Sequence, residues 1–443
     1  MTALPEKVNV LLVGSGGREH ALAWQLVRSP RLGRLFVDCD ANAGLRELGT
    51  PCPEPFTLQH KYYLERWMES AQIGFIVIGP EGPLAEGLAD VFTKPHRPVF
   101  GPSKAAARLE WDKGWAKQVM RQTSVPTAEG RTLTNLNAAL AYVTERNEPC
   151  VVKATGLCAG KGVTVCSDAA QAIAAVKRCM DTREFGDAGS AVIVEERLEG
   201  QEVSVFALVD GRTITLLDTV QDHKQVGEGD TGPNTGGMGA YSPTPLLDDE
   251  QLRIIAQEVF VPTVDGLRRQ GIEYRGVLFA GLMLTHAGPK VLEFNCRFGD
   301  PETQVLMARF QGDLLATLWR TATGSLDEAR FSFSSQSACC VVVCAAGYPG
   351  TVQKGKPISG LRGLPHGNGD RAQSLHFHAG TARANDGQVV SAGGRVANAV
   401  AVADDLAAAA RAATDSAAGI TFDGAFFRRD IGHRVLARLT PGR

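Results

Sequence analysis

The chain has 443 residues, of which 44% are hydrophobic and 21% charged, and its 46 basic and 48 acidic side chains give a formal net charge of −2. This length exceeds what one hydrophobic core supports, so we expect roughly three or four domains. The balanced charge, without a run of lysine or arginine, argues against nucleic acid as the main partner. The longest apolar run lies around residues 338–346. It is shorter than the about 20 residues that cross a membrane, so we expect a cytoplasmic protein without membrane contact.

Ten cysteines are scattered along the chain without a Cys-x-x-Cys pair. The closest group, Cys339, Cys340 and Cys344, lies within an apolar pattern typical of a strand. We therefore expect reduced thiols packed in the core and no zinc site.

The N-terminal part alternates apolar, strand-like runs with helical patterns, which predicts a parallel sheet covered by helices. The predicted strands are residues 8–13, 35–37 and 73–78, and the predicted helices are residues 19–28 and 62–70. Gly14-Ser15-Gly16-Gly17 follows the first strand and opens the first helix, where backbone N–H groups can bind an anion. A dinucleotide-binding fold is the alternative, with Asp38 or Asp40 as the ribose-binding acid, but Glu19 replaces the third glycine of that fingerprint. We favour a smaller phosphate-bearing substrate.

A second glycine-containing turn, residues 79–83, follows the strand at 73–78. Parallel sheets bind ligands at this edge, so Glu81 is a candidate ligand. A rigid structural turn is the alternative.

Residues 149–166 predict a hairpin in which the first strand, residues 149–154, carries Lys153 and residues 156–162 form a glycine-rich turn. The segment is not a Walker loop, because it lacks Lys followed by Ser or Thr at the required glycine spacing. Glycines allow the backbone to lie close to phosphates, while Lys153 and Lys161 supply positive charge. We therefore predict a phosphate-binding flap rather than a purely structural hairpin.

A strand at 191–194 runs into Glu195, Glu196 and Leu198, followed by a further strand through Val209. A strand that leaves the flap for the next domain is a natural hinge for an adenine pocket. We interpret this segment as such a hinge.

The segment 221–241 has no strand or helix pattern, and such a long stretch inside a compact domain predicts a functional loop. It begins with Asp222, His223 and Lys224, which offer an acid, a titratable base and a cation. A solvated surface loop is the alternative.

Residues 277–284 and 291–294 predict a second hairpin, and its returning strand carries Glu293 and Asn295 on one face because side chains alternate along a strand. Two oxygen donors beside phosphates suit Mg²⁺. If the strand continues, Arg297 lies on the same face, where its planar group could bind a carboxylate bidentately. A hairpin end with a surface ion pair is the alternative.

The C-terminal part predicts strands at 338–344 and 396–402 and an alanine-rich helix at 404–418. The glycine- and histidine-rich stretch 363–380 contains His376 and His378, which lack the further ligands that a metal site needs. We expect this part to cover the active site.

The order of these parts resembles the ATP-grasp ligases, and the whole chain resembles the phosphoribosylamine–glycine ligase family. The resemblance runs from end to end and rests on seven motifs: GSGGREHALAW from Gly14, GPEGPL from Gly79, KATGLCAGKGV from Lys153, QDHK from Gln221, DTGPNTGGMGAYSP from Asp230, EFNCRFGDPETQ from Glu293 and FHAGT from Phe377. The DTGPNTGGMGAYSP and EFNCRFGDPE segments are the most specific.

The resemblance implies an α/β fold in four parts. These are an N-terminal parallel-sheet domain at 1–107, an ATP-grasp domain with its flap at 108–198 and its metal-binding part at 199–330, and a C-terminal α+β domain at 331–443. It also implies ATP-dependent ligation of glycine to 5-phosphoribosylamine through glycyl phosphate, in purine biosynthesis. We expect small-molecule substrates and a monomer.

The resemblance further implies roles for individual residues. ATP would be bound by Lys113, Lys153, Gly160, Lys161, Gly162, Glu195, Glu196, Leu198 and Glu202, and Mg²⁺ or Mn²⁺ by Glu293 and Asn295. The other substrates would be bound by Gly16, Gly17, Glu19, Asn42, Glu81, Asp222, Arg297 and Asp300. Lys153, Asp222 and Arg297 would be catalytic, with Asp222 and Arg297 binding glycine.

The chain departs from the family pattern at several positions, namely Asp40, Ala41, Trp111, Asp112, Thr155, Cys158 and Arg197. None of these replaces a metal ligand or a flap lysine, so we expect activity. Three alternatives stay open: a related ligase or carboxylase for another acid, a nicotinamide-dependent oxidoreductase, and a protein that binds nucleotide without consuming it.

Overall fold

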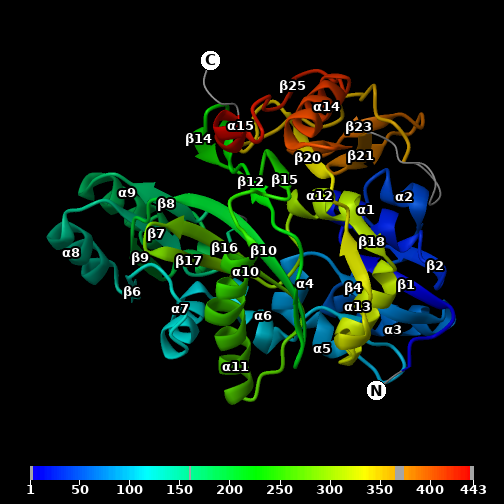
Figure 1. The fold of residues 1–443 in the computed structure, drawn as a ribbon, viewed down its shortest axis with the longest axis horizontal. Helices are drawn as coiled ribbons and strands as arrows, with labels where there is room; N and C mark the ends of the chain where they lie inside the picture. The colour runs from blue at the N-terminus through cyan, green and yellow to red at the C-terminus, as the bar shows by residue number, and fades with distance from the viewer. Residues whose placement is uncertain (1–2, 159–160, 365–373, 440–443) are drawn as a thin grey trace.

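The computed structural model describes residues 3–158, 161–364 and 374–439. Four larger sheets and three two-stranded sheets are formed by the described residues. In Figure 1 the N-terminal sheet lies at the right, a small sheet with two helices projects at the left, and the C-terminal sheet lies at the top. The α/β fold class predicted from the sequence is confirmed. The division into four domains by residue number stays a prediction.

The N-terminal sheet is parallel and has the strand order β3-β2-β1-β4-β5. Its strands are β1 Val8–Val13, β2 Leu32–Val37, β3 Thr50–Pro51, β4 Ile73–Ile78 and β5 Val99–Phe100, and its helices are α1 Gly17–Leu26, α2 Leu45–Leu48, α3 Lys61–Ser70, α4 Glu81–Glu86 and α5 Leu88–Phe92. Helices cover both faces, so β1 is apolar apart from Asn9: Val10 and Leu12 share a core with α1, and Leu11 and Val13 share one with α3. The order reverses between β1 and β4, which places both glycine-containing turns at the ligand-binding edge.

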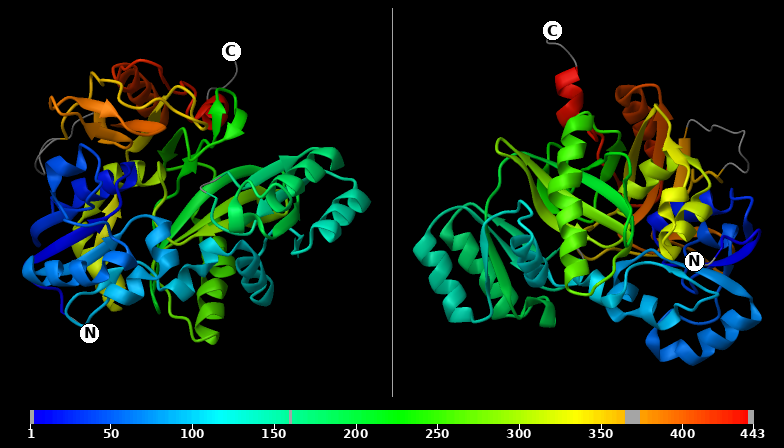
Figure 2. Two further views of the ribbon diagram at one scale, coloured as in Figure 1. Left: turned by 180° about the vertical axis from the view of Figure 1, so that it is seen from behind. Right: turned by 60° about the horizontal axis from the view of Figure 1, so that its bottom comes forward.

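A small antiparallel sheet, which we call the flap sheet, has the order β6-β9-β7-β8. Its elements are β6 Gly130–Leu133, α8 Leu136–Arg146, β7 Cys150–Ala154, β8 Val163–Cys166, α9 Ala169–Met180 and β9 Val192–Glu196. Asp168 caps α9 by accepting a hydrogen bond from the backbone N–H of Gln171. Figure 2 shows the flap sheet and its two helices extending away from the rest of the molecule. The hairpin predicted around Lys153 is confirmed.

A central antiparallel sheet has the order β11-β10-β16-β17. Its strands are β10 Gln201–Asp210, β11 Ile214–Leu216, β16 Arg275–Thr285 and β17 Gly288–Asn295, and the adjacent helices are α10 Asp249–Ile255 and α11 Val261–Arg269. The predicted second hairpin is confirmed, but β17 ends at Asn295, so Arg297 lies beyond the strand. The pairing of β16 with β17 shifts by one residue between Glu293 and Val291. This bulge leaves Leu292 as the extra residue next to Glu293.

The C-terminal sheet has the order β12-β15-β20-β24-β21, with β25 added to β20. Its strands are β12 Gln221–Asp222, β15 Gly239–Ser242, β20 Ser337–Ala345, β21 Ser374–His378, β24 Arg395–Ala403 and β25 Ala425–Phe426, and its helix is α14 Leu406–Ala418. The expected strand and helix pattern of this part is confirmed. The ten cysteines are free, and Cys339, Cys340 and Cys344 are buried in β20 as expected.

The prediction that residues 221–241 lack strands is wrong. They contain β12, β15 and the hairpin of β13 Gln225–Gly227 with β14 Thr231–Asn234. These strands are only two to four residues long, and β15 pairs with β20, about a hundred residues later in the chain. An alternating apolar pattern is therefore absent from the local sequence although the segment is paired.

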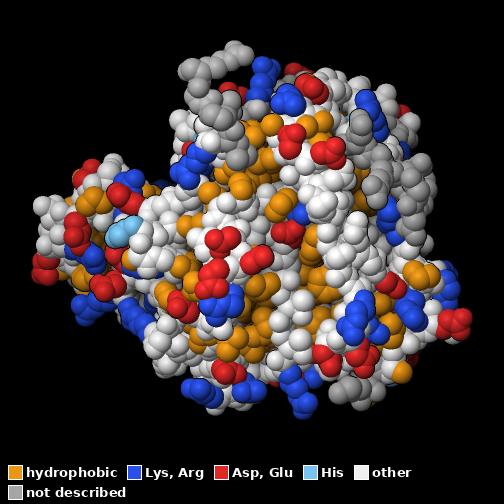
Figure 3. Space-filling model, in the orientation of Figure 1, with side chains coloured by type: hydrophobic (Ala, Val, Ile, Leu, Met, Phe, Trp, Pro, Cys, Tyr) orange, Lys and Arg blue, Asp and Glu red, His pale blue; other side chains and the backbone are white. Residues whose placement is uncertain are grey.

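The remaining helices link these sheets. They are α6 Lys104–Trp111, α7 Lys113–Gln122, α12 Glu302–Arg309, α13 Leu314–Thr323 and α15 His433–Leu439, and the remaining strands are β18 Phe310–Gly312, β19 Phe331–Phe333, β22 Thr381–Arg383 and β23 Val389–Ser391. The helix α12 packs between α1 and β20. No helix in the described ranges combines the length and apolar character needed to cross a membrane. Acidic and basic side chains are interspersed on the face drawn in Figure 3.

Gly17, the first residue of α1, lies in a close contact between the N-terminal part and the C-terminal sheet. A Cβ atom at Gly17 would lie 2.3 Å from Nδ2 of Asn398 and 2.8 Å from Nε2 of Gln304. Both amides are buried and cannot swing into solvent. We therefore predict that Gly17→Ala lowers the free energy of unfolding by about 1–3 kcal/mol through overpacking.

Urea unfolding of the variant and of Gly82→Ala measures this effect. Gly82 lies in α4, and a Cβ atom there would have no neighbour within 4 Å. The control should keep the stability of the natural chain. Equal midpoints for Gly17→Ala and the natural chain would contradict the close fit.

Candidate active site

Two buried lysines hold the carboxylate of Glu195 at the end of β9. Nζ of Lys117 lies 2.8 Å from Oε1 and Nζ of Lys153 lies 2.7 Å from Oε2. Lys153 also donates to the carbonyl of Leu292 at 2.9 Å, in the bulge of β17. The flap sheet and the central sheet are therefore joined through the ammonium of Lys153. Burial lowers the pKa of Lys117 in spite of the adjacent carboxylate.

Lys117 was missed in the sequence analysis. It follows Lys113 by one helical turn on α7, so the two side chains lie on the same face of the helix. This i, i+4 spacing was the available signal. Lys113 itself begins α7, and its Nζ donates to the carbonyl of Gly156 at 3.0 Å.

Two of the family departures have local explanations. Asp112 caps α7, because its side chain accepts a hydrogen bond from the backbone N–H of Trp115 at 2.9 Å. Thr155 donates through Oγ1 to the carbonyl of Ala191 at 3.3 Å. Neither residue removes Lys113 or Lys153 from the site.

The other residues predicted for ATP differ in their surroundings. The carboxylate of Glu196 accepts from Nζ of Lys290 at 2.8 Å and from the backbone N–H of Glu129 at 2.9 Å, and the lysine lowers its pKa. Leu198 is half-buried just after β9, Lys161 is exposed and Gly162 is buried. Gly160 lies outside the described residues. The roles of these residues toward nucleotide stay predictions.

Positive charge gathers around Glu293. Burial alone would raise the pKa of this carboxyl, but Lys224, Lys113, Lys153 and Arg297 outweigh it and lower the pKa. Glu293 is therefore ionised. Nζ of Lys224 lies 3.0 Å from Oε2 of Glu202, and although burial opposes its charge, the carboxylates of Glu202, Asp222 and Glu293 raise its pKa well above the ordinary value.

The donors on β17 fit a divalent cation. Glu293 and Asn295 are two residues apart on one strand face, as predicted, and both offer oxygen atoms. Oδ1 of Asn295 accepts from Nη2 of Arg297 at 3.2 Å, which leaves the second lone pair of this oxygen for another partner. The ionised carboxylate and the amide oxygen form a site suited to a divalent cation.

Arg297 links this strand to the N-terminal part. Its Nε lies 3.2 Å from Oε2 of Glu81, its Nη2 lies 3.0 Å from Oε1 of Glu110, and its Nη1 donates to the carbonyl of Phe298 at 3.1 Å. The hydrogen bonds to Glu81, Phe298 and Asn295 use three of the five N–H groups of the guanidinium, and Glu110 is an ion-pair partner. Arg297 lies beyond the end of β17, and its bidentate contact with a substrate carboxylate stays a prediction.

The two acids around Arg297 behave differently. Burial alone would raise the pKa of Glu81, but Arg297 and Arg18 hold it at about 2. Burial raises the pKa of Glu110, which also accepts from the backbone N–H of Cys296 at 2.7 Å. Glu110 was missed in the sequence analysis, because a single acid on a helical pattern gives no signal.

The loop of Gly14–Gly17 is braced by buried side chains. Oε2 of Glu19 accepts from the backbone N–H of Gly16 at 2.8 Å, and Oε1 lies 2.5 Å from Nε of Arg18. Nδ2 of Asn42 donates to the carbonyls of Ser15 at 2.8 Å and of His378 at 3.0 Å. Glu19 and Asn42 thus shape the loop, and any direct contact with substrate stays a prediction.

Asp38 also supports this loop, because its Oδ2 accepts from the backbone N–H of Gly14 at 3.1 Å. With Cys39 and Asp40 it brings three potential ligand atoms within 4.8 Å of one another at the end of β2. Consecutive residues in one turn account for this closeness. The engagement of Asp38 with the loop disfavours its use as a ribose-binding acid.

Asp300 lies where three parts of the chain meet. The backbone N–H of Arg18 reaches Oδ2 of Asp300 at 3.4 Å, and Nη2 of Arg395, from β24, lies 3.4 Å from the same atom. Nη1 of Arg395 donates to the carbonyls of Asp300 and Gly236, at 2.6 Å each. The C-terminal sheet therefore contributes directly to this edge of the site, and no local motif marked Arg395.

Asp222 faces the same interior, where burial raises its pKa, and Glu302 is buried nearby. Burial, followed by the charge of Asp222, raises the pKa of Glu302 to about 7. His223 does not face the site: it is 2% exposed, and burial followed by Arg428 lowers its pKa to about 3. The prediction that His223 serves as a titratable base beside Asp222 is therefore wrong.

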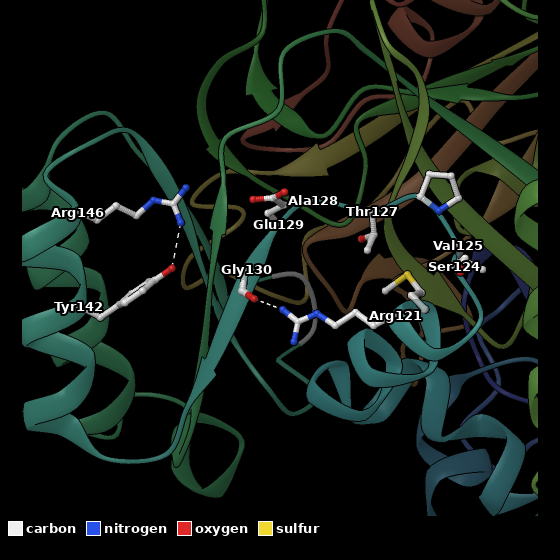
Figure 4. Close-up of a pocket in the computed structure, with 11 residues that line it drawn as sticks. Arg121, Ser124, Val125, Thr127, Ala128, Glu129, Gly130, Tyr142 and Arg146 are labelled. Carbon is white, nitrogen blue, oxygen red and sulfur yellow. Dashed lines mark hydrogen bonds between the residues drawn. The ribbon is translucent and has the colours of Figure 1, made fainter.

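A cavity of about 480 Å³ lies behind the hinge, between the end of α7, residues 124–130 and α8. Figure 4 shows Arg121 donating to the carbonyl of Gly130 and Arg146 donating to Oη of Tyr142, at 3.0 Å for the second bond. Among the described residues, none of those predicted for the site lines this cavity. The cavity is therefore separate from the cluster around Glu293.

Comparisons with known proteins agree along the whole chain. Three family models described as phosphoribosylglycinamide synthetase match the chain. The N-domain model matches residues 8–110, the ATP-grasp (A) domain model residues 111–303 and the C-domain model residues 338–434. The chain is 44% identical over 433 residues to a phosphoribosylamine–glycine ligase of Rhizobium meliloti, and the match covers 98% of this chain and 100% of that protein.

Solved structures show the same fold. A crystal structure of phosphoribosylamine–glycine ligase from Thermotoga maritima has a TM-score of 0.82 at 31% identity, and covers 96% of this chain and 100% of that one. The biotin carboxylase domain of a 2-oxoglutarate carboxylase from Hydrogenobacter thermophilus has a TM-score of 0.71 at 15% identity, and covers 95% of this chain and 92% of that one. The second similarity concerns the fold alone.

The buried pair of His20 and His378 predicts a dependence of stability on pH. The backbone N–H of His378 donates to Nδ1 of His20 at 2.8 Å, and burial lowers the pKa of both rings, that of His378 to about 4. Both rings are neutral when folded, whereas the unfolded chain takes up protons below about pH 6.5. Stability is therefore full above that pH and falls toward pH 4, by about 1.4 kcal/mol per pH unit for each such histidine.

We predict that the free energy of unfolding of His378→Asn, measured in urea, decreases less steeply between pH 6.5 and pH 5 than that of the natural chain. The difference in slope corresponds to about one proton fewer taken up on unfolding. The matched control is His286→Asn, which changes an exposed histidine in the turn before β17. The control should follow the slope of the natural chain. An unchanged slope in His378→Asn would contradict the neutral state of this ring.

Proposed function

The chain belongs to the phosphoribosylglycinamide synthetase family of ATP-grasp enzymes, and we propose that the cluster around Glu293 and Arg297 is where it joins glycine to 5-phosphoribosylamine. The chain is an ATP-dependent phosphoribosylamine–glycine ligase of purine biosynthesis. One observation supports assigning the reaction to this cluster. The charges of Lys113, Lys153 and Lys224 act together on Glu293, and Arg297, two residues after Asn295, is paired with Glu81 of the N-terminal part.

The chemical problem is the poor leaving group of a carboxylate. An oxygen of the glycine carboxylate attacks the γ-phosphorus of ATP, forming a P–O bond while the bond to the β-phosphate oxygen breaks and ADP leaves. The amine of 5-phosphoribosylamine then attacks the carbonyl carbon of glycyl phosphate. A C–N bond forms, the C–O bond to phosphate breaks, and the amine loses a proton. The products are glycinamide ribonucleotide, ADP and phosphate.

Positioning and neutralisation of charge dominate phosphoryl transfer, and the side chains of this site supply both. We propose that Lys113 and Lys153 bind the phosphates of ATP, with Lys153 oriented by Glu195. Glu293 and Asn295 would hold Mg²⁺ or Mn²⁺, which when bound neutralises phosphate charge. The ribose and adenine would lie against Glu202 and the hinge of Glu195–Leu198.

We propose that Asp222 binds the ammonium group of glycine and that Arg297 orients its carboxylate. Asp222 is buried beside Lys224, and Arg297 is anchored by Glu81 and Glu110. The phosphoribosylamine would lie toward the Gly14–Gly17 loop, where Asn42 and Asp300 meet the C-terminal sheet. Because glycyl phosphate hydrolyses in water, closure of the glycine-rich turn of the flap over this region would protect it. We also propose a cytoplasmic monomer.

We predict that ADP release by the purified chain requires glycine and freshly prepared 5-phosphoribosylamine together. Coupled ADP assays with each substrate omitted measure this, and mass spectrometry identifies the product. ATP consumption with glycine replaced by another acid, and none with glycine, would favour a different ligase. Nucleotide binding without turnover in any mixture would favour a catalytically silent protein.

We predict that Glu293→Gln lowers turnover by about 10²–10³, the loss typical of one preorganised electrostatic contact. The substitution keeps the size of the side chain but removes the charge that faces Lys113, Lys153 and Lys224. Steady-state ADP release measures the change, and Glu250→Gln, at an exposed ion pair on α10, is the control. Near-normal turnover in Glu293→Gln would show that the metal site is assigned to the wrong residues.

A further inference from the structure

His223 lies between two residues of the site but points away from them. It follows Asp222 at the end of β12 and precedes Lys224, and its own backbone is paired: the N–H donates to the carbonyl of Gly239 at 2.9 Å and the carbonyl accepts from Met238 at 2.8 Å. Asp222 and Lys224 face Glu293 and Glu302, whereas the ring of His223 packs against the end of the chain. One short segment therefore connects the site with the C-terminal residues.

The ring of His223 is fixed by the segment 428–434. The backbone N–H of Gly432 donates to Nε2 of His223 at 3.2 Å, and the ring of His433 lies 5.5 Å away. Since Nε2 accepts, the proton of the neutral ring is on Nδ1. Nδ1 is buried without a hydrogen-bond partner among the described residues. The sequence thus keeps a polar ring in a place where an apolar side chain would avoid this cost.

An ion-pair network ties the same C-terminal segment to the β13–β14 hairpin. Arg428, 1% exposed, binds Asp430 through two bonds of 2.8 Å and donates to Oδ1 of Asp230 at 3.0 Å. Arg434 donates to Oδ2 of Asp230 at 2.6 Å, and the backbone N–H of Gly229 donates to Asp430 at 2.8 Å. Asp230, the first residue of the DTGPNTGGMGAYSP motif, is therefore a docking point for the C-terminal segment.

The hairpin continues this connection into the site. The carbonyl of Lys224 accepts from both the backbone N–H and Oγ1 of Thr235, at 2.7 Å each, and Arg428 donates to the carbonyl of Gln225 at 3.0 Å. The backbone of Lys224 is therefore held by Thr235, and that of the next residue by Arg428 of the C-terminal segment. Its ammonium lies at the other end, beside Glu202 and Asp222.

We propose that His223 is a positioning residue for the glycine site: the segment 428–434, docked on Asp230, fixes the His223 ring and so sets the placement of Asp222. This inference rests on the proposed function, since it takes Asp222 as a ligand of glycine. The phosphoribosylamine region around Asn42 and the Gly14–Gly17 loop is braced by other contacts, so it should be independent of His223.

Kinetics of two variants test this role. His223→Leu removes the acceptor for Gly432, whereas His223→Gln offers Oε1 as a replacement. We expect His223→Leu to raise KM for glycine about tenfold, equivalent to about 1.4 kcal/mol, with KM for 5-phosphoribosylamine changed less than about twofold. His223→Gln should recover most of the affinity for glycine. A merely structural role would reduce the active fraction and hence kcat, without separating the two KM values.

A third variant covers the case in which His223→Leu does not fold. Asp230→Asn weakens the docking of Arg428 and Arg434 and should raise KM for glycine about threefold, in the same direction and again without an effect on 5-phosphoribosylamine. An unchanged KM for glycine in the folded variants, or an equal increase for both substrates, would overturn the proposal. If the natural chain fails to consume ATP with glycine and 5-phosphoribosylamine, the proposed function fails instead.

Discussion

The arrangement of the site depends on the buried guanidinium of Arg297. It joins Glu81 at the edge of the N-terminal sheet, Glu110 on α6 and Asn295 at the end of β17, within 3.0–3.2 Å in each case. The carboxylate of Glu110 would be costly to bury alone, and so would the arginine. Their mutual neutralisation allows the N-terminal part, α6 and β17 to meet around one cation.

The rest of the candidate site contains several lysines whose charges face carboxylates of the protein itself. Lys117 and Lys153 share Glu195, and Lys113, Lys153 and Lys224 act together on Glu293. A triphosphate with a divalent ion is the natural counterpart of such a cluster. The C-terminal sheet completes the other edge through Arg395 and the carbonyl of His378, so domains distant in the sequence contribute to one site.

The sequence was informative where function follows from local pattern. Alternation along β17 predicted that Glu293 and Asn295 share a face, and glycine density with Lys153 predicted the flap hairpin. It failed where long-range pairing decides: β12 and β15 are too short to be recognised before β20 completes their sheet. Glu110, Lys117 and Arg395 were not recognised as site residues for a similar reason. Their partners Arg297, Glu195 and Asp300 are distant in the sequence and become neighbours only in the folded chain. His223 was misassigned because a motif gives proximity in sequence but not the direction of a side chain.

The central claim is that this interior brings the carboxylate of glycine to the γ-phosphate of ATP. Glycine labelled with ¹⁸O in both carboxylate oxygens, turned over in unlabelled water with ATP and 5-phosphoribosylamine, tests it most directly. Mass analysis should find one labelled oxygen in each phosphate released and the other in the amide product. Unlabelled phosphate at full turnover would show that no acyl phosphate forms and would contradict the account.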